Sequence, residues 1–372
     1  MKKLVAMLLV FTMSISLAAC GGNKSSESTS GESKANESTV GDTKAAEENT
    51  AAPVENSGEP VSGGTVNIPI TDDPTTLQGW MLRNTNESAL APAIYETLLR
   101  YDETGKPQPF LLESFEGDPE ALTYTMVVRD GITFQDGTPL DAEAVKWNLD
   151  YYKENGVLTG SYFNYVESVE VADDKTVVVH MSQWDALFDY GLARTCFICS
   201  PSAVESLGVD GFNEMPVGTG AFKVTKWVHG EGIYTEKYDQ YWQGTPYLDG
   251  VNFKIYASTA TQQAALEVGD LDIMNLSGDA ITADALKAKG YTMSNAAIPS
   301  TGYTLCFNSQ ADGPLKDLRV RQAIAYAVDT KAICDSLLGD GAYGTESTQW
   351  AISSSTEYNL SLIHISEPTR LD

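Results

Sequence analysis

Apolar and polar residues alternate along several short stretches of the chain, which is the pattern of half-buried β-strands. In the first stretch, Val66, Ile68 and Ile70 alternate with polar residues from Thr65 onward. The predicted strands are 65–70, 122–128, 132–134, 166–171, 176–181, 222–225 and 271–274. Asp-Gly and Asp-Asp turns separate several of the strands between residues 122 and 181. This part therefore predicts a small antiparallel meander followed by a hairpin.

Other stretches repeat their apolar residues every three or four positions, as amphipathic helices do. The predicted helices cover 89–99, 142–153, 260–268 and 318–328. We expect Asp141 to cap the second helix and Gly269 to close the third. The last helix carries one apolar stripe, which we interpret as core packing. Its members are Val320, Ala323, Ile324, Ala327 and Val328. A chain that mixes helices and strands in this way indicates an α/β fold.

The N-terminus has the pattern of an export signal. Lys2 and Lys3 precede an apolar run over 4–17 that is too short for a comfortable membrane span. Leu17-Ala18-Ala19-Cys20 resembles a bacterial lipobox, so we expect residues 1–20 to be a lipoprotein signal peptide and Cys20 to carry lipid. The alternative is an ordinary signal peptide with an incidental cysteine. Residues 21–62 contain almost no large apolar side chain, which predicts a disordered tether.

Size and charge narrow the possible functions. With 372 residues the chain exceeds what a single core normally holds, so we expect at least two lobes. The formal net charge of −27 excludes nucleic acid as a partner, because such binding depends on clustered Lys and Arg. The same charge gives no attraction to anionic membranes, so attachment to a membrane depends on the lipid.

The sequence gives little sign of catalytic chemistry. Its histidines are His180, His229 and His364, and no spacing typical of a zinc site occurs. Cys196 and Cys199 form one Cys-x-x-Cys, which is either a short disulfide, half of a metal site or a reduced pair. Cys306 and Cys334 are expected to be small buried hydrophobes. We expect no enzyme, no cofactor and no metal.

Nine segments, in this order, resemble the family 5 solute-binding proteins of ABC importers, which include dipeptide, oligopeptide, nickel-chelate and glutathione receptors. The segments are IYETL (94–98), VRDGITFQDGTPL (128–140), AEAV (142–145), PVGTGAF (216–222), YWQG (241–244), ALEVGDLD (265–272), FN (307–308), LKD (315–317) and VRQA (320–323). The sequence departs from the family at Ala221, where proline is usual. We interpret the glycine-rich piece and Tyr241-Trp242 as scaffold, and the glycine spacing fits no phosphate loop.

The resemblance implies a two-lobed, type II periplasmic-binding-protein-like α/β fold with an extra subdomain in the first lobe. Lobe I would comprise 63–96 and 215–275, the inserted subdomain 97–214, and an incomplete lobe II 276–359. Residues 360–372 resemble the translation of a sequencing adapter, so we expect them to be an artefact that follows a C-terminal truncation. Ligand would lie between the lobes, where domain interfaces favour pockets.

A peptide receptor needs a fixed cation for a carboxylate and aromatic walls. Arg194 lies where the family's nickel-chelate receptors carry an arginine that faces the ligand carboxylate. Arg83, with Asn84 beside it, is expected at the edge of the cleft, and Tyr303 and Trp350 are expected to be cleft aromatics from the second lobe. The competing interpretations are a solvated surface charge for the arginines and core packing for the aromatics.

The leading hypothesis is a monomeric, lipid-anchored, extracytoplasmic receptor that captures di- and oligopeptides and delivers them to ABC permease subunits. A receptor for nickel chelates is the alternative within transport. A surface hydrolase is the remote alternative from another class.

Overall fold

We describe a computed structural model of the chain. The structure describes residues 60–82, 85–157, 159–276, 279–294, 306–339 and 343–344. The predicted signal peptide, the lipobox, nearly all of the predicted tether and the predicted adapter segment lie outside these residues.

One four-stranded sheet is built from distant parts of the sequence. Its strands are β1 (Thr65–Ile70), β8 (Phe222–Val228), β9 (Gly232–Lys237) and β10 (Gly250–Ile255). The order is β1-β10-β9-β8, with β1 parallel to β10 and the other neighbours antiparallel. The strand predicted at 65–70 is confirmed, and the predicted strand at 222–225 extends three residues further.

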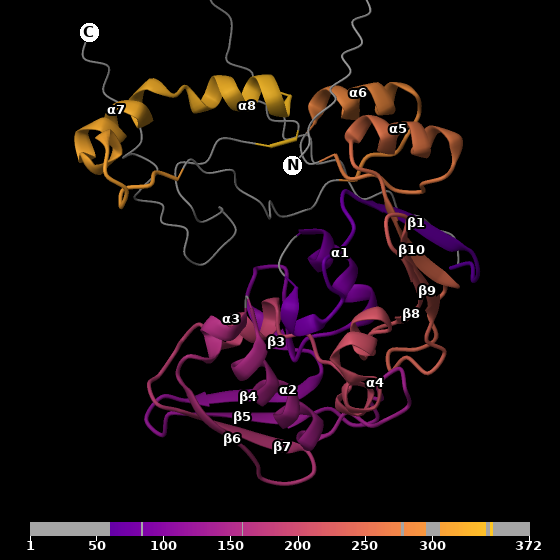
Figure 1. Ribbon diagram of the computed structural model, residues 1–372, viewed down its shortest axis with the longest axis vertical. Coiled ribbons are helices and arrows are strands. Elements are labelled where there is room, and N and C mark those ends of the chain that lie inside the picture. Colours follow the sequence, from indigo (N-terminus) through magenta and orange to yellow (C-terminus); the bar gives the residue numbers. More distant parts are fainter. Residues whose placement is uncertain are drawn as a thin grey trace, which may run out of the picture. The chain divides into compact units, whose positions relative to one another are not determined.

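A second four-stranded sheet joins two hairpins that are separated in the sequence by a helix (Figure 1). Its strands are β4 (Leu112–Asp118), β5 (Thr123–Val128), β6 (Val166–Val171) and β7 (Thr176–Met181), in the order β4-β5-β7-β6 and antiparallel throughout. Burial alternates along β5 and β7, as the sequence predicts. Helix α2 (Ala142–Asn155) packs across this sheet and buries Val145 and Leu149.

Side-chain caps begin the longer helices. Asp141 accepts a hydrogen bond from the Ala144 backbone N–H at the start of α2, as predicted. Ser200 caps α4 (Pro201–Glu214) and Ser258 caps α5 (Thr259–Val268) in the same way. Gly269 ends α5 in a left-handed conformation, which confirms its predicted role.

Three predicted elements differ from the structure. Helix α1 (Thr85–Ile94) ends five residues before the predicted boundary, because the following residues bond to another segment: the Glu96 carbonyl accepts from the Ile198 N–H at 2.8 Å. Residues 132–134 form only an isolated bridge, between Thr133 and Pro139. Residues 271–274 form no strand, although the Asp272 N–H donates to the Asn67 carbonyl of β1.

The remaining elements are short. They are η1 (Gly79–Met81), β2 (Leu99–Tyr101), β3 (Pro107–Pro109), η2 (Thr159–Phe163), α3 (Phe188–Arg194), α6 (Ala280–Ala288), η3 (Pro314–Lys316), α7 (Leu318–Ala327) and α8 (Thr330–Leu338).

The C-terminal helices have no core of their own among the described residues. Neither α7 nor α8 buries a side chain there, so the predicted packing of the 318–328 stripe is not seen. The helical span itself is confirmed at 318–327. Cys306 is exposed and Cys334 is half-buried, so the prediction that both are buried is wrong.

Candidate functional site

Arg194 is the last residue of α3, and its side chain is exposed. Within the described part of the chain its guanidinium makes no hydrogen bond or ion pair, whereas the other described arginines have partners. Arg100 lies 4.6 Å from the centre of the Phe110 ring, Arg129 donates to the Phe110 and Leu112 carbonyls, Arg319 pairs with Asp317, and Arg321 donates to the Leu315 and Lys316 carbonyls. No described residue therefore pairs with this guanidinium. Its position at a helix C-terminus also suits a solvated charge.

Tyr101, in β2, lies beside α3. Its hydroxyl donates a hydrogen bond to the Tyr190 carbonyl oxygen at 3.1 Å, and the two ring centres are 6.1 Å apart. Burial raises the pKa of Tyr101 to about 12, and the charge of Arg194 acts against this rise. The guanidinium is therefore within electrostatic reach of the phenol. A cation beside an aromatic wall can recognise a carboxylate on a small ligand.

The other predicted functional residues lie outside the described part of the chain. They are Cys20, Arg83, Asn84, Tyr303 and Trp350. Their roles stay predictions.

The segment that leads toward Arg83 is anchored to the end of α4. The Asn213 side-chain oxygen accepts hydrogen bonds from the Thr76 hydroxyl at 2.8 Å and from the Leu77 N–H at 3.0 Å. The Gln78 side chain donates to the Val209 carbonyl at 3.0 Å. These bonds fix the backbone just before the predicted edge of the cleft.

Trp80, in η1, fixes the same segment through its ring. It is almost fully buried, stacks on Phe212 with 5.3 Å between ring centres, and meets Tyr151 edge to face at 4.7 Å. The preceding Gly79 has no room for a side chain, since a Cβ there would lie 2.9 Å from the Cys199 sulfur. Sequence periodicity could not predict these contacts, because the segment is neither a regular helix nor a strand.

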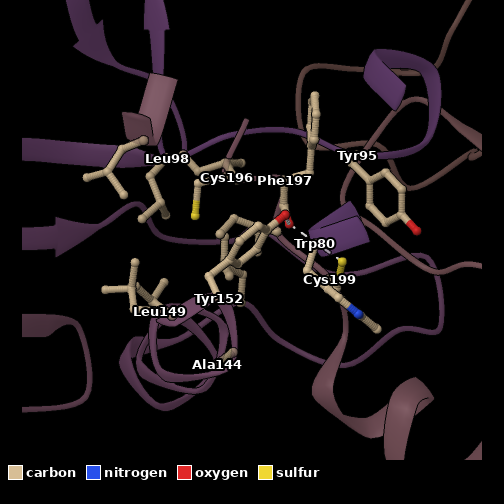
Figure 2. Close-up of a cluster of buried hydrophobic side chains, with 14 of the residues drawn as sticks. Trp80, Tyr95, Leu98, Ala144, Leu149, Tyr152, Cys196, Phe197 and Cys199 are labelled. Carbon is tan, nitrogen blue, oxygen red and sulfur yellow. Dashed lines mark hydrogen bonds between the residues drawn. The ribbon is translucent and has the colours of Figure 1, made fainter. Parts of the chain in front are cut away.

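Cys196 and Cys199 lie in an extended segment, where Phe197 bridges to Thr97 and Cys199 to Gly218. Both thiols are free and fully buried. Residues three apart in an extended chain point to opposite faces, so their sulfurs cannot meet. In Figure 2 the two sulfurs lie on either side of the Tyr152 hydroxyl, which donates to the Phe197 carbonyl at 2.9 Å.

This geometry decides among the alternatives for the pair. Burial raises the pKa of both thiols well above the usual range, which keeps them protonated and unreactive. They pack as small apolar side chains, and they form neither a disulfide nor half of a metal site.

Comparison with known proteins identifies the family. Residues 106–361 match the family model described as bacterial extracellular solute-binding proteins, family 5, middle. The chain belongs to this family. The α/β expectation is confirmed, and the fold is the type II fold of periplasmic solute-binding proteins. Family 5 members are transport binding proteins and not enzymes.

Individual relatives differ in the ligands for which they are named. The chain is 30% identical over 264 residues to the glutathione-binding protein GsiB of Salmonella paratyphi A, a match that covers 70% of this chain and 51% of the relative. It thus spans about half the length of the curated relatives it matches.

Among solved structures, the oligopeptide-binding protein AppA of Bacillus subtilis, in complex with a nonapeptide, is 26% identical with a TM-score of 0.66; the match covers 81% of this chain and 60% of that one. A nickel ABC transporter structure from Bacillus halodurans is 26% identical with a TM-score of 0.57; the match covers 73% and 55%.

In this family 5 protein, Glu96 is a buried carboxylate that the sequence does not single out. It accepts hydrogen bonds from the Tyr241 hydroxyl at 2.6 Å and from the Trp242 indole N–H at 2.8 Å. Burial raises its pKa, and these donors and the charge of Arg100 act against the rise. The family resemblance includes the segments that hold Glu96 and Tyr241-Trp242, but it does not show that these residues are in contact. The cluster confirms that Tyr241-Trp242 is scaffold.

The glycine-rich turn of the family 5 protein packs against the end of α1. A Cβ on Gly218 would collide with the Ile94 carbonyl oxygen, and a Cβ on Gly220 would lie 2.6 Å from the Ile94 carbonyl carbon. The Gln135 side chain donates to the carbonyls of Ile94, Gly220 and Phe222, which joins the turn to both neighbours. The predicted structural role of this turn is confirmed.

Two of the surface hollows among the described residues lie away from Arg194. One, of about 450 Å³, lies between the starts of α2 and α4 and includes Trp147, and the other, of about 520 Å³, lies along the apolar side of α7. Across the described ranges no group of three or more His, Cys, Asp or Glu side chains is arranged to hold a metal ion, and no helix there is long and apolar enough to cross a membrane.

Proposed function

We propose that this family 5 protein captures small peptides outside the cytoplasm and delivers them to the membrane subunits of an ABC importer. We further propose that it acts as a monomer held to the outer face of the membrane by lipid on Cys20. The observation that carries the proposal is the family match over residues 106–361. The peptide preference is supported by the GsiB relatives, named for a tripeptide, and by the structure of AppA with a nonapeptide.

The proposed mechanism uses lobe closure. Ligand enters between lobe I and lobe II, rotation about the hinge buries it, and the closed form docks on the permease. Arg194, whose side chain is exposed, would bind a carboxylate of the ligand. Closure of the lobes would then exclude water from this ion pair and strengthen it. Arg83 and Asn84 would line the same side, with Tyr303 and Trp350 opposite.

Calorimetry on the full chain tests the proposal. A pool of di- to hexapeptides and glutathione should each be titrated, and heat of binding is expected for at least one of them. Absence of binding to every peptide would overturn the peptide assignment.

A nickel chelate is the second candidate ligand. It is favoured by the 26% identity to the nickel ABC transporter structure and by the exposed guanidinium of Arg194, because an amino-acid chelate exposes carboxylates. Titration with nickel plus histidine, against nickel alone and histidine alone, separates it from the peptide assignment. Binding of the mixture without binding of peptides would establish the chelate.

A further inference from the structure

His229 lies between two carboxylates that belong to different parts of the chain. It sits in the turn between β8 and β9, where its Nδ1 is 3.3 Å from an Asp73 oxygen and its Nε2 is 3.5 Å from a Glu214 oxygen. Its ring centre is 4.2 Å from that of Trp227. Each ring nitrogen faces a different carboxylate, so the imidazole bridges Asp73 and Glu214.

Each carboxylate belongs to a distinct structural element. Asp73 follows β1, and its oxygens also accept from the Trp227 indole N–H and the Gly230 backbone N–H, both at 2.9 Å. Glu214 is the last residue of α4. On the turn itself the nearest carboxylate in sequence is Glu231, which binds the Tyr234 hydroxyl. The imidazole therefore meets negative groups from two other elements and an aromatic face from its own.

The bridge closes a loop of contacts around residues 73–82. One end of this segment is held at Asp73 by the β8–β9 turn, and its middle is held by Asn213 and Val209 of α4. His229 adds a direct connection between the Asp73 end and the end of α4. Residues 73–82 are thus held at Asp73 and at the end of α4, and the His229 side chain contacts both places.

We propose that His229 is a proton-dependent strut, which when protonated pulls the Asp73 loop and the end of α4 together and stabilises segment 73–82. Histidine is the side chain that ordinarily changes charge between about pH 5 and pH 8. A protonated ring donates from both nitrogens, so it can serve both carboxylates at once, and its charge also favours the face of Trp227. A neutral ring has one donor and can satisfy only one carboxylate.

Hydrogen exchange on the full chain tests the strut. At about pH 5.5, residues 73–82 and 209–214 should exchange more slowly in the wild type than in His229→Asn, and at about pH 8 the two proteins should exchange alike. The melting temperature should follow, with a wild-type advantage of about 1 to 3 °C at the lower pH only, as expected for exposed ion pairs. Equal protection in both proteins at the lower pH would overturn the proposal.

Two further variants separate the local bridge from the effect of net charge. His180→Asn deletes a histidine whose Nε2 lies 3.1 Å from Glu170 on the second sheet, so it changes the charge equally without touching the strut. It should leave protection of 73–82 unchanged, and a loss equal to that of His229→Asn would refute the local link. His229→Arg keeps a positive charge with several donors at every pH, so it should protect the segment at both pH values.

Discussion

The guanidinium of Arg194 carries a full charge that the described part of the protein leaves unpaired. If ligand binding closes water away from it, Arg194→Ala should weaken a ligand that carries a carboxylate by about 2 to 4 kcal/mol. Calorimetry on the full chain measures this loss. Arg194→Lys should recover only part of it, because an ammonium cannot form the two parallel bonds of a guanidinium.

The matched control for this prediction is Lys106→Ala, which removes the same charge from the loop between β2 and β3. It should leave ligand affinity unchanged. An unchanged affinity in Arg194→Ala would remove Arg194 from the site and leave it as a surface charge at a helix end.

The contribution of Glu96 to stability should depend on pH. Because burial raises its pKa in the folded protein, ionisation is harder there than in the unfolded chain, so its contribution to stability is greatest in acid and falls as the pH rises through the folded value. Glu96→Gln cannot ionise. The melting temperature of Glu96→Gln relative to wild type should therefore rise between about pH 4 and about pH 7.

The exposed Glu205→Gln on α4 removes the same charge without burial and should give a difference that stays flat with pH. A difference for Glu96→Gln that falls or stays flat would show that the surrounding donors favour the ionised form more than burial opposes it.

The role of a single residue could be predicted from the sequence only where its contacts are with residues close to it in the chain. Asp141 and Gly269 act through neighbours three or four positions away, so their roles could be predicted from spacing alone. Glu96, Trp80 and His229 each act through at least one residue more than seventy positions away, and the sequence around them does not mark these contacts. The role of Arg194 was proposed from resemblance, and only the three-dimensional structure shows that no described residue pairs with its guanidinium.

At the scale of elements, the Asp141 side chain caps the start of α2, and the contribution of this cap to stability can be measured. Asp141→Ala removes the acceptor for the Ala144 N–H, and the free energy of unfolding should fall by about 1 kcal/mol. Asp141→Asn keeps an acceptor and should retain most of the stability. Chemical denaturation followed by circular dichroism is the measurement, and equal stability of Asp141→Ala and wild type would show that water replaces the cap.

Elements with a regular alternation were predicted well, and elements ended by tertiary contacts were not. Strands β5 and β7 show the two-residue period in their burial, and both were predicted. Strands β1 and β6 were also predicted, although burial does not alternate along them and the register of β6 shifts between Val166 and Ser168. Helix α1 was predicted to begin and end too late, at 89–99 and not at 85–94. Leu98 and Leu99 extend its apolar spacing although the backbone after Ile94 bonds to another segment. β4 was missed because its sequence, LESFEGD, holds few apolar residues, most of its side chains remaining accessible to solvent.

At the scale of the whole molecule, the order of family segments carried more information than any single element. That order pointed to a type II binding-protein fold, which the matching structures confirm. It could not say which residues meet across a cleft, because those contacts depend on how the lobes approach one another. The apolar stripe of α7 shows the same limit, since its spacing predicts burial while α7 buries no side chain among the described residues.

The proposed membrane attachment through Cys20 concerns the whole molecule as well, because the predicted tether of residues 21–62 would join the lipid to the binding lobes. Cys20→Ala should leave the full chain outside the lipid phase when cells are fractionated, since the chain's charge of −27 gives no attraction to an anionic membrane. Its peptide affinity should equal that of the wild type, because the tether holds almost no large apolar side chain with which to contact a lobe. Cys306→Ala, which removes an exposed cysteine, should change neither property. Continued membrane attachment of Cys20→Ala would mean that an uncleaved signal segment, and not lipid, holds the protein in place.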